Sequence, residues 1–191
     1  MTESTPNQAI LKGSKTLAQV RMAFIMLTLF VLVLLSLLLR LVFFLFPRHL
    51  FLRFNVRFII YPFSKLLMWI VGVKLVVEGK MPSSQHLVVS NHQGILDSLL
   101  HMAISPCMVI SNMLVRNMKV IGSVMELLGF VFVDRSRRMS IVELLQPATS
   151  MITQSKVNMS FFPEGKSNDG VELLPFHAPF FKIAIDSGSG V

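Results

Sequence analysis

The chain contains a single cysteine, and only 15% of its 191 residues are charged. One cysteine excludes an internal disulfide, and with it a small fold stapled by disulfides. Cys107 lies in an apolar run, where we expect a buried core thiol. Hydrophobic residues make up 53% of the chain, a share that soluble domains rarely reach. We therefore expect part of the chain to lie in lipid, with little disorder outside the termini.

Acidic residues are scarce in the first part of the chain. Residues 1–80 hold ten Lys and Arg but two acidic residues, whereas residues 81–191 hold eight of each. The positive excess thus lies beside the most apolar segments, which favours an anionic membrane surface as the partner. These basic residues are interleaved with Leu and Phe runs that are too apolar for a solvated phosphate-binding face. Nucleic acid is therefore not expected as a partner.

Two apolar segments predict a membrane anchor after a polar tail over residues 1–18. A helix over about 22–46 would rise roughly 36 Å, enough to cross a hydrocarbon core of about 30 Å. It is too long for a signal peptide, and no small-x-small cleavage site follows. The next segment, about 50–73, is apolar but contains basic residues and the helix breaker Pro62, so we expect it at the membrane interface.

Residues 19–73 are thus predicted to be membrane-associated helices. Basic residues flank the first apolar run on both sides, so the positive-inside rule gives no orientation for a single crossing. The alternative is a helical pair that dips into the membrane and returns. We expect a membrane location, with the domain that follows on the cytoplasmic side.

From residue 74 onward, short β-branched runs alternate with helical patterns. We expect strands at KLVVEG, HLVVS, CMVIS, FVFVD and NMSFF, and helices near 95–104, 113–128, 140–155 and 179–187. This alternation predicts an α/β domain over 74–191, with a mixed sheet flanked by helices.

The stretch VVSNHQGILDS, residues 88–98, places a histidine and a carboxylate after a short apolar run. On one continuous helix, His92 and Asp97 would point about 140° apart. They meet only if His92 lies on the turn after a strand and Asp97 in the first turn of a helix. The carboxylate would then fix the imidazole tautomer and leave the other ring nitrogen as a base. The alternative is a capping histidine and a first-turn aspartate that merely begin a helix.

Two further strand ends carry charged residues. Arg135 follows FVFVD, and its planar guanidinium suits a phosphate, although a solvated basic turn is the alternative. In FFPEGKS, residues 161–167, the final GKS resembles the end of a phosphate-binding P-loop. We reject a nucleotide site because that loop needs a glycine at position 160, which is serine. Glu164 and Gly165 could instead pair with an arginine and expose backbone N–H groups to an anion.

The ordered set of His-x4-Asp, Gly-x-x-Phe-x-Asp-Arg and Phe-Pro-Glu-Gly after an apolar N-terminal segment resembles the glycerolipid acyltransferases, of the 1-acylglycerol-3-phosphate O-acyltransferase type. The resemblance covers roughly residues 60–187 and implies a membrane-bound enzyme. It implies that His92 deprotonates the glycerol hydroxyl of a lysophospholipid, which attacks an acyl thioester, and that Asp97 orients His92. The donor would be acyl-CoA or acyl carrier protein, with no metal, no other cofactor and no covalent acyl-enzyme. It implies an acceptor-binding group of Arg135, Glu164, Gly165 and Lys166.

Two departures from the family pattern leave alternatives open. Lys166 and Ser167 stand where the third block usually has threonine and arginine, so another lysolipid could replace lysophosphatidate as the acceptor. The chain ends at IDSGSGV, where the family continues into a Val-Pro-rich strand. We expect the domain to be truncated there, and an inactive member that only binds membrane is the second alternative. His86, His101 and His177 belong to no motif and are expected to be structural or exposed.

Overall fold

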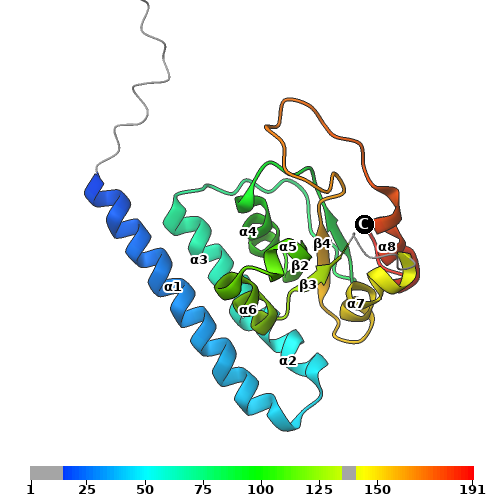
Figure 1. Cartoon of the computed structure of the whole chain (residues 1–191), viewed down its shortest axis with the longest axis horizontal. Helices are drawn as coiled ribbons and strands as arrows, with labels where there is room; N and C mark the ends of the chain where they lie inside the picture. The colour runs from blue at the N-terminus through cyan, green and yellow to red at the C-terminus, as the bar shows by residue number, and fades with distance from the viewer. Residues whose placement is uncertain (1–14, 135–140) are drawn as a thin grey trace, which may run out of the picture.

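The computed structural model describes residues 15–134 and 141–191 (Figure 1). The N-terminal part is a helical pair in which α1 runs one way and α2 to α3 return alongside it (Figure 1). The pair consists of α1 (Lys15–Val42), the 3-10 turn η2 (Phe43–Leu45), α2 (Arg48–Phe54), the π-helix η3 (Asn55–Ile60) and α3 (Tyr61–Val71).

The second segment stays helical through Pro62, a residue that often breaks helices. Pro62 lies in the first turn of α3, directly after the π-helical turn. In the preceding π-helical turn the backbone N–H of Tyr61 donates to the carbonyl of Val56, five residues earlier, and this shift in the hydrogen-bond ladder accommodates the N–H that proline lacks. The segment therefore runs helically from Arg48 to Val71.

The remainder is an α/β unit, as predicted. Its elements are β1 (Leu87–Val89), α4 (Ile95–Ile104), β2 (Cys107–Asn112), α5 (Met113–Arg116), α6 (Lys119–Leu128), β3 (Val131–Val133), α7 (Ile141–Thr153), β4 (Asn158–Phe161), η4 (Ala178–Phe181) and α8 (Lys182–Ser187). In Figure 1, α3, α4 and α6 lie on one side of the sheet, and α7 and α8 lie on the other.

The four strands form one sheet in the order β1-β4-β2-β3, and each described pairing is parallel. The predicted mixed sheet is therefore wrong. A helix separates each strand from the next along the chain, so each connection brings the chain back to the same end of the sheet. The strand predicted at residues 74–79 does not form either. Within residues 15–134 and 141–191 that segment pairs with no strand, and Val76 is 75% exposed.

Apolar side chains from both faces of the sheet form the core. Met108 and Met159 on the central strands are fully buried, as are Ile152 on α7 and Ile183 on α8. Cys107 is also fully buried, which confirms the expected core thiol. Burial raises the pKa of this thiol to about 12.

A buried polar contact joins the helical pair to the α/β unit. The Ser36 hydroxyl on α1 donates to Asn55 Oδ1 on the π-helix, with 2.8 Å between the oxygens. Asn55 Nδ2 in turn donates to the carbonyl of Leu128 at the end of α6, at 3.0 Å. Ser36 and Asn55 are both fully buried, so the two bonds fix α1 against the sheet-covering helices.

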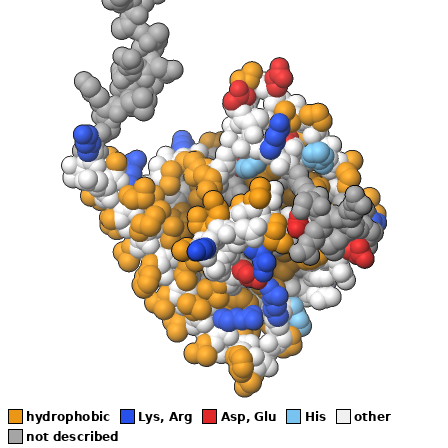
Figure 2. Space-filling model, viewed as in Figure 1, with side chains coloured by type: hydrophobic (Ala, Val, Ile, Leu, Met, Phe, Trp, Pro, Cys, Tyr) orange, Lys and Arg blue, Asp and Glu red, His pale blue; other side chains and the backbone are white. Residues whose placement is uncertain are grey.

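The outer side of α1 carries hydrophobic side chains that are exposed to solvent. Figure 2 shows them spread over the face that α1 forms, and Phe30 (65% exposed) and Leu41 (73%) are examples. Lys15–Leu45 and Arg48–Val71 are both long and apolar enough to cross a membrane, judged by length and composition. Such surfaces indicate contact with a membrane or another protein.

Candidate active site

His92 lies in the turn between β1 and α4, and Asp97 lies in the first turn of α4. This turn leaves the sheet at the carboxyl ends of its parallel strands, the edge at which open α/β sheets bind ligands. β1 is paired with β4, so the segment after Phe161 leaves the sheet beside the His92 turn. The order of the strands thus brings the first and third predicted motifs together.

One carboxylate oxygen of Asp97 accepts hydrogen bonds both from the His92 ring and from the backbone at the start of α4. Asp97 Oδ2 lies 2.9 Å from His92 Nδ1, and it also accepts from the backbone N–H groups of Gln93 (2.6 Å) and Gly94 (2.9 Å). Partial burial by itself would raise the pKa of Asp97. The hydrogen bonds from Gly94, Gln93 and His92 outweigh it and leave the pKa of this carboxyl below its ordinary value.

The charged carboxylate selects one tautomer of His92. Because Asp97 can only accept, His92 carries its proton on Nδ1, and Nε2 keeps its lone pair. The His92 side chain is 21% exposed, so the ring is open to solvent on part of its surface. This arrangement can accept a proton at Nε2 from a hydroxyl brought to it, with the carboxylate stabilising the resulting imidazolium.

Phe162 stacks on the His92 ring. Their ring centroids are 4.0 Å apart, and their planes differ by 11°. Phe162 also stacks on His101 of α4, with 4.9 Å between the centroids and 26° between the planes. Burial lowers the pKa of His101 to about 4, so this imidazole is neutral at neutral pH. Two histidines therefore share one aromatic partner from the end of β4.

The turn after Phe162 bonds directly to the His92 turn. The backbone N–H of Asn168 donates to the His92 carbonyl at 2.9 Å, and the Asn168 side-chain amide donates to Glu164 Oε2. Glu164 is buried, and its Oε1 has no hydrogen-bond partner among the described residues. Gly165 has a φ of +76°, a backbone conformation that favours glycine. The side chain of Lys166 is exposed beside these residues.

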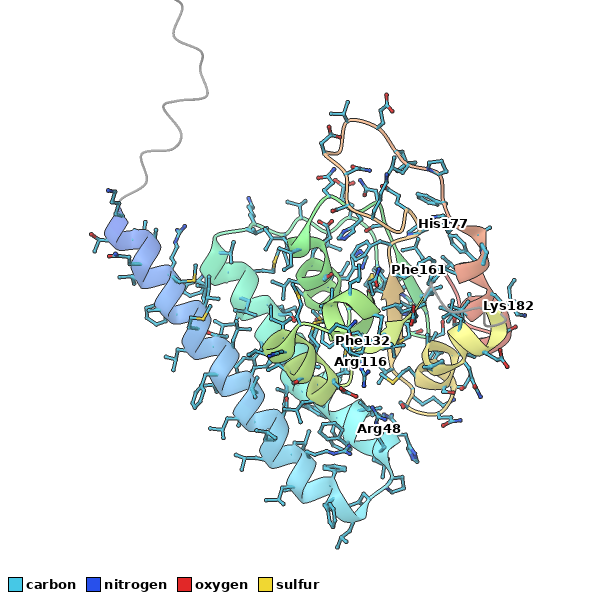
Figure 3. The ribbon with its side chains drawn as sticks, in the orientation of Figure 1. Arg48, Arg116, Phe132, Phe161, His177 and Lys182 are labelled. Carbon is cyan, nitrogen blue, oxygen red and sulfur yellow. The ribbon has the colours of Figure 1, made fainter. Side chains whose placement is uncertain are left out.

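A long connection leads from the third motif to η4 and α8. The end of this connection, near His177, returns toward the sheet. His177 N–H donates to the carbonyl of Pro163 at 2.8 Å, and Figure 3 shows His177 where this loop comes back. His177 is exposed, whereas His86 at the opposite end of β1 is buried and lies 3.0 Å from the Ser105 hydroxyl through Nε2. Neither side chain joins the His92 turn by a described bond.

Arg135, the predicted phosphate ligand, lies outside the described residues. The strand that leads to it, β3, ends at the same edge of the sheet as β1 but is separated from it by β4 and β2. Neighbouring strands are about 4.8 Å apart, so β1 and β3 lie roughly 14 Å apart. Within 15–134 and 141–191, no three His, Cys, Asp or Glu side chains gather as metal ligands would.

Three residues that contact the His92 turn are not predicted by the sequence motifs: Phe162, Asn168 and His101. The spacing of Asp97 and His101, four residues on a helix, was an available signal, because such residues share one helix face. No comparable signal exists for Asn168, since its contact depends on how the turn after β4 folds back.

Comparisons with known proteins give a consistent result. The family model described as Acyltransferase matches residues 73–191. The 1-acyl-sn-glycerol-3-phosphate acyltransferase of Neisseria gonorrhoeae is 35% identical over 114 residues, which are 58% of this chain and 44% of that protein. The alpha form of this enzyme from Homo sapiens is 29% identical over 124 residues, 62% of this chain and 44% of the relative. The chain thus spans less than half the length of these relatives.

A solved structure shares the fold. The crystal structure of the 1-acyl-sn-glycerophosphate (LPA) acyltransferase PlsC from Thermotoga maritima matches with a TM-score of 0.61 and 22% sequence identity. The match covers 90% of this chain and 72% of the Thermotoga chain. A match of this extent includes most of the N-terminal helical pair, because the pair is much longer than the unmatched tenth of the chain.

Proposed function

Because this chain belongs to the acyltransferase family, we propose that it transfers a fatty acyl group from a thioester to the free hydroxyl of 1-acylglycerol-3-phosphate, giving phosphatidate. The observation that carries the proposal is the 2.9 Å contact between His92 Nδ1 and Asp97 Oδ2 at the carboxyl edge of the sheet. It leaves Nε2 as a base in a part-exposed turn.

In the proposed reaction, His92 Nε2 takes the proton from the acceptor hydroxyl as its oxygen attacks the thioester carbonyl carbon. The tetrahedral intermediate collapses with cleavage of the carbon–sulfur bond. The departing thiolate then takes the proton back from the imidazolium, which restores His92. The Asp97 carboxylate stabilises the charged imidazolium while it exists. No covalent acyl-enzyme, metal or other cofactor has a part in this step, and the donor is acyl-CoA or acyl carrier protein.

We propose that Arg135 binds the phosphate of the acceptor and that Glu164, Gly165 and Lys166 line the acceptor site. Glu164 supports this because its buried Oε1 lacks a partner among the described residues. A cationic group at that point would satisfy it, and an arginine does this well. Lys166 supplies a positive charge in the position where other members have threonine. This change favours a second candidate acceptor, a lysolipid with a different head group.

We propose that the helical pair holds the enzyme in a membrane. The exposed apolar side of α1 and the positive excess of residues 1–80 both suit an anionic bilayer. The start of α1 and the end of α3 are adjacent, since a side chain at Gly72 would lie 3.6 Å from the Arg21 guanidinium. The open end of the pair has four basic residues, and three lie near the turn between its helices: Lys15, Arg21, Lys74 and Lys80 against Arg40, Arg48 and Arg53. The positive-inside rule then favours the cytoplasmic side for the catalytic domain.

The test uses the purified chain in anionic vesicles, supplied with lysophosphatidate and acyl-CoA, and in a parallel arm with acyl carrier protein. Phosphatidate is measured by mass spectrometry. His92→Ala should reduce its formation by roughly 10²–10⁴-fold. The matched control is His49→Ala, which changes an exposed histidine on α2. A second acceptor arm uses lysolipids that bear larger head groups.

Phosphatidate that depends on His92 and not on His49 supports the proposal. If only the lysolipids with larger head groups are acylated, one of these lipids and not lysophosphatidate is the acceptor. Absence of every acylated product from the folded, vesicle-bound chain would reject the activity in favour of an inactive member that only binds membrane.

A further inference from the structure

His101 has no part in the proton transfer proposed for His92, yet its side chain lies close to the His92 turn. It is on α4 one helical turn after Asp97, so the two side chains share a helix face. Its side chain is 1% exposed. Helix α4 thus places both a carboxylate and a buried imidazole beside the His92 turn.

A hydrogen-bonded path runs from His101 to the backbone directly before His92. His101 Nε2 lies 2.8 Å from the Ser90 hydroxyl oxygen, and that hydroxyl donates to the carbonyl of Asn91 at 2.8 Å. Since the hydroxyl has one proton and gives it to Asn91, the imidazole must donate its Nε2 proton to Ser90. The path therefore fixes the peptide that precedes the base.

A second path runs through aromatic stacking. Phe162 stacks on the His92 ring and on the His101 ring, as described above. His101 therefore limits the movement of Phe162, and Phe162 limits the tilt of the His92 ring. Together with the bond from Asp97, these contacts restrain the imidazole from three directions.

We propose that His101 is a positioning residue that holds the His92 ring in the orientation needed for acyl transfer, through Ser90 and Asn91 on one side and Phe162 on the other. The proposal rests on the proposed function of His92 as the base. In this proposal His101 acts on the His92 ring in addition to packing in the core. A base that is part-exposed and lies on a turn needs such support, because small misplacements reduce rates strongly.

The other ring nitrogen of His101 argues against a purely structural role. With the proton on Nε2, Nδ1 is a buried acceptor, and it has no partner among the described residues. Such a group destabilises a core relative to an apolar side chain of similar size. Stability alone would thus favour leucine at this position. The neutral state of the ring keeps the Nε2–H donor without placing a second charge beside His92.

The test compares His101→Leu with His101→Phe and Ser90→Ala in the vesicle assay. His86→Leu is the matched control, because His86 is also a buried histidine with Nε2 beside a serine hydroxyl, at the other end of β1. We expect His101→Leu to lower kcat about tenfold with the acceptor KM within twofold of the original. His101→Phe keeps an aromatic ring against Phe162 and should recover part of the loss. Ser90→Ala should lower kcat to a smaller extent.

A second readout does not depend on turnover. The solvent exchange of the His92 Nδ1 proton is measured by NMR in detergent micelles, alongside the melting temperature. His101→Leu should speed this exchange at least fivefold without lowering the melting temperature, whereas His86→Leu should not change the exchange. Unchanged exchange, or a kcat loss matched by lost folded protein, would overturn the positioning role. If the unmodified chain shows no turnover but His101→Leu still speeds the exchange of the His92 proton, the proposed acyl transfer is rejected and the positioning role of His101 stands.

Discussion

The substitution Asp97→Asn tests the charge on the carboxylate while keeping its shape. Asp97 Oδ2 accepts from His92 and from two backbone N–H groups, of Gln93 and Gly94. An asparagine must place its oxygen in that position, because its NH₂ group would face the two backbone donors. The oxygen therefore still receives the His92 Nδ1 proton, and the tautomer is retained.

The size of the effect follows from that geometry. What is lost is the charge on one acceptor of a hydrogen bond to an imidazolium. A hydrogen bond to a charged group contributes about 1.5–3 kcal/mol and a neutral one about 0.5–1.5 kcal/mol, so removal of the charge costs about 1–1.5 kcal/mol. Each 1.36 kcal/mol is tenfold in rate, so kcat should fall roughly 5- to 13-fold. The acceptor KM should stay close to its original value, because Asp97 acts on His92 and not on the bound lipid.

The assay measures initial rates of phosphatidate formation in vesicles for the unmodified chain and for Asp97→Asn. The control is Asp186→Asn, which removes a carboxylate that pairs with Lys182 on α8 at 2.8 Å. A fall of less than threefold would mean that the charge of Asp97 does not act on the base. A fall beyond roughly 10⁴-fold would indicate that the asparagine has reversed the His92 tautomer, which would refute the placement of its oxygen toward the backbone N–H groups.

Two other outcomes are expected. Asn55→Ala leaves the Leu128 carbonyl and the Ser36 hydroxyl without their buried partner, so unfolding in detergent should become easier by about 2–3 kcal/mol; Ser36→Ala, which leaves the Leu128 bond intact, should cost less. Cys107, with a pKa raised to about 12 and no exposed surface, should resist alkylation at pH 8 in the folded chain and react after denaturation; rapid labelling of the folded chain would contradict its burial.

Asp97 should also contribute to how the stability of the chain responds to acid. Its pKa is below the ordinary value of 3.8 in the folded chain. Its contribution to stability is therefore fully present above that ordinary value, and it is lost as the pH falls through the lowered folded pKa. In thermal unfolding followed by circular dichroism, Asp97→Asn should weaken this decline below pH 4. An unchanged acid response would show that Asp97 is not the group involved.

Local patterns were sufficient for most of the fold. The alternation of β-branched runs and helical patterns predicted four of the strands and the helices between them, because burial on both faces gives parallel strands a recognisable apolar run. The strand expected at 74–79 has the same local pattern, and it fails because no neighbouring strand pairs with it. The mixed sheet was wrong for a related reason. Strand direction depends on how each helix returns the chain, which no single segment encodes.

The candidate site also has a part that local sequence predicts and a part that depends on strand order. His92 and Asp97 are close in sequence, so their approach follows from one turn and one helix start. Phe162 and Asn168 reach His92 from 70 and 76 residues away along the chain, because β4 pairs with β1 in the sheet. That pairing is a property of the strand order, which could not be worked out from any one motif. The exposed apolar side of α1 was predictable from the sequence, but the buried bond from Ser36 to Asn55 was not.

The two interpretations of His92 and Asp97 that the sequence left open are compatible in the structure. One carboxylate oxygen both accepts from the first backbone N–H groups of α4 and receives the His92 ring. Helix formation therefore brings the orienting group of the base into place, and the strength of the capping bonds fixes how rigidly it is held. His101 follows on the same face one turn later, so any shift of α4 would move both supports of His92 together. A change that displaces α4 without touching the site should thus reduce turnover more than it reduces lipid binding.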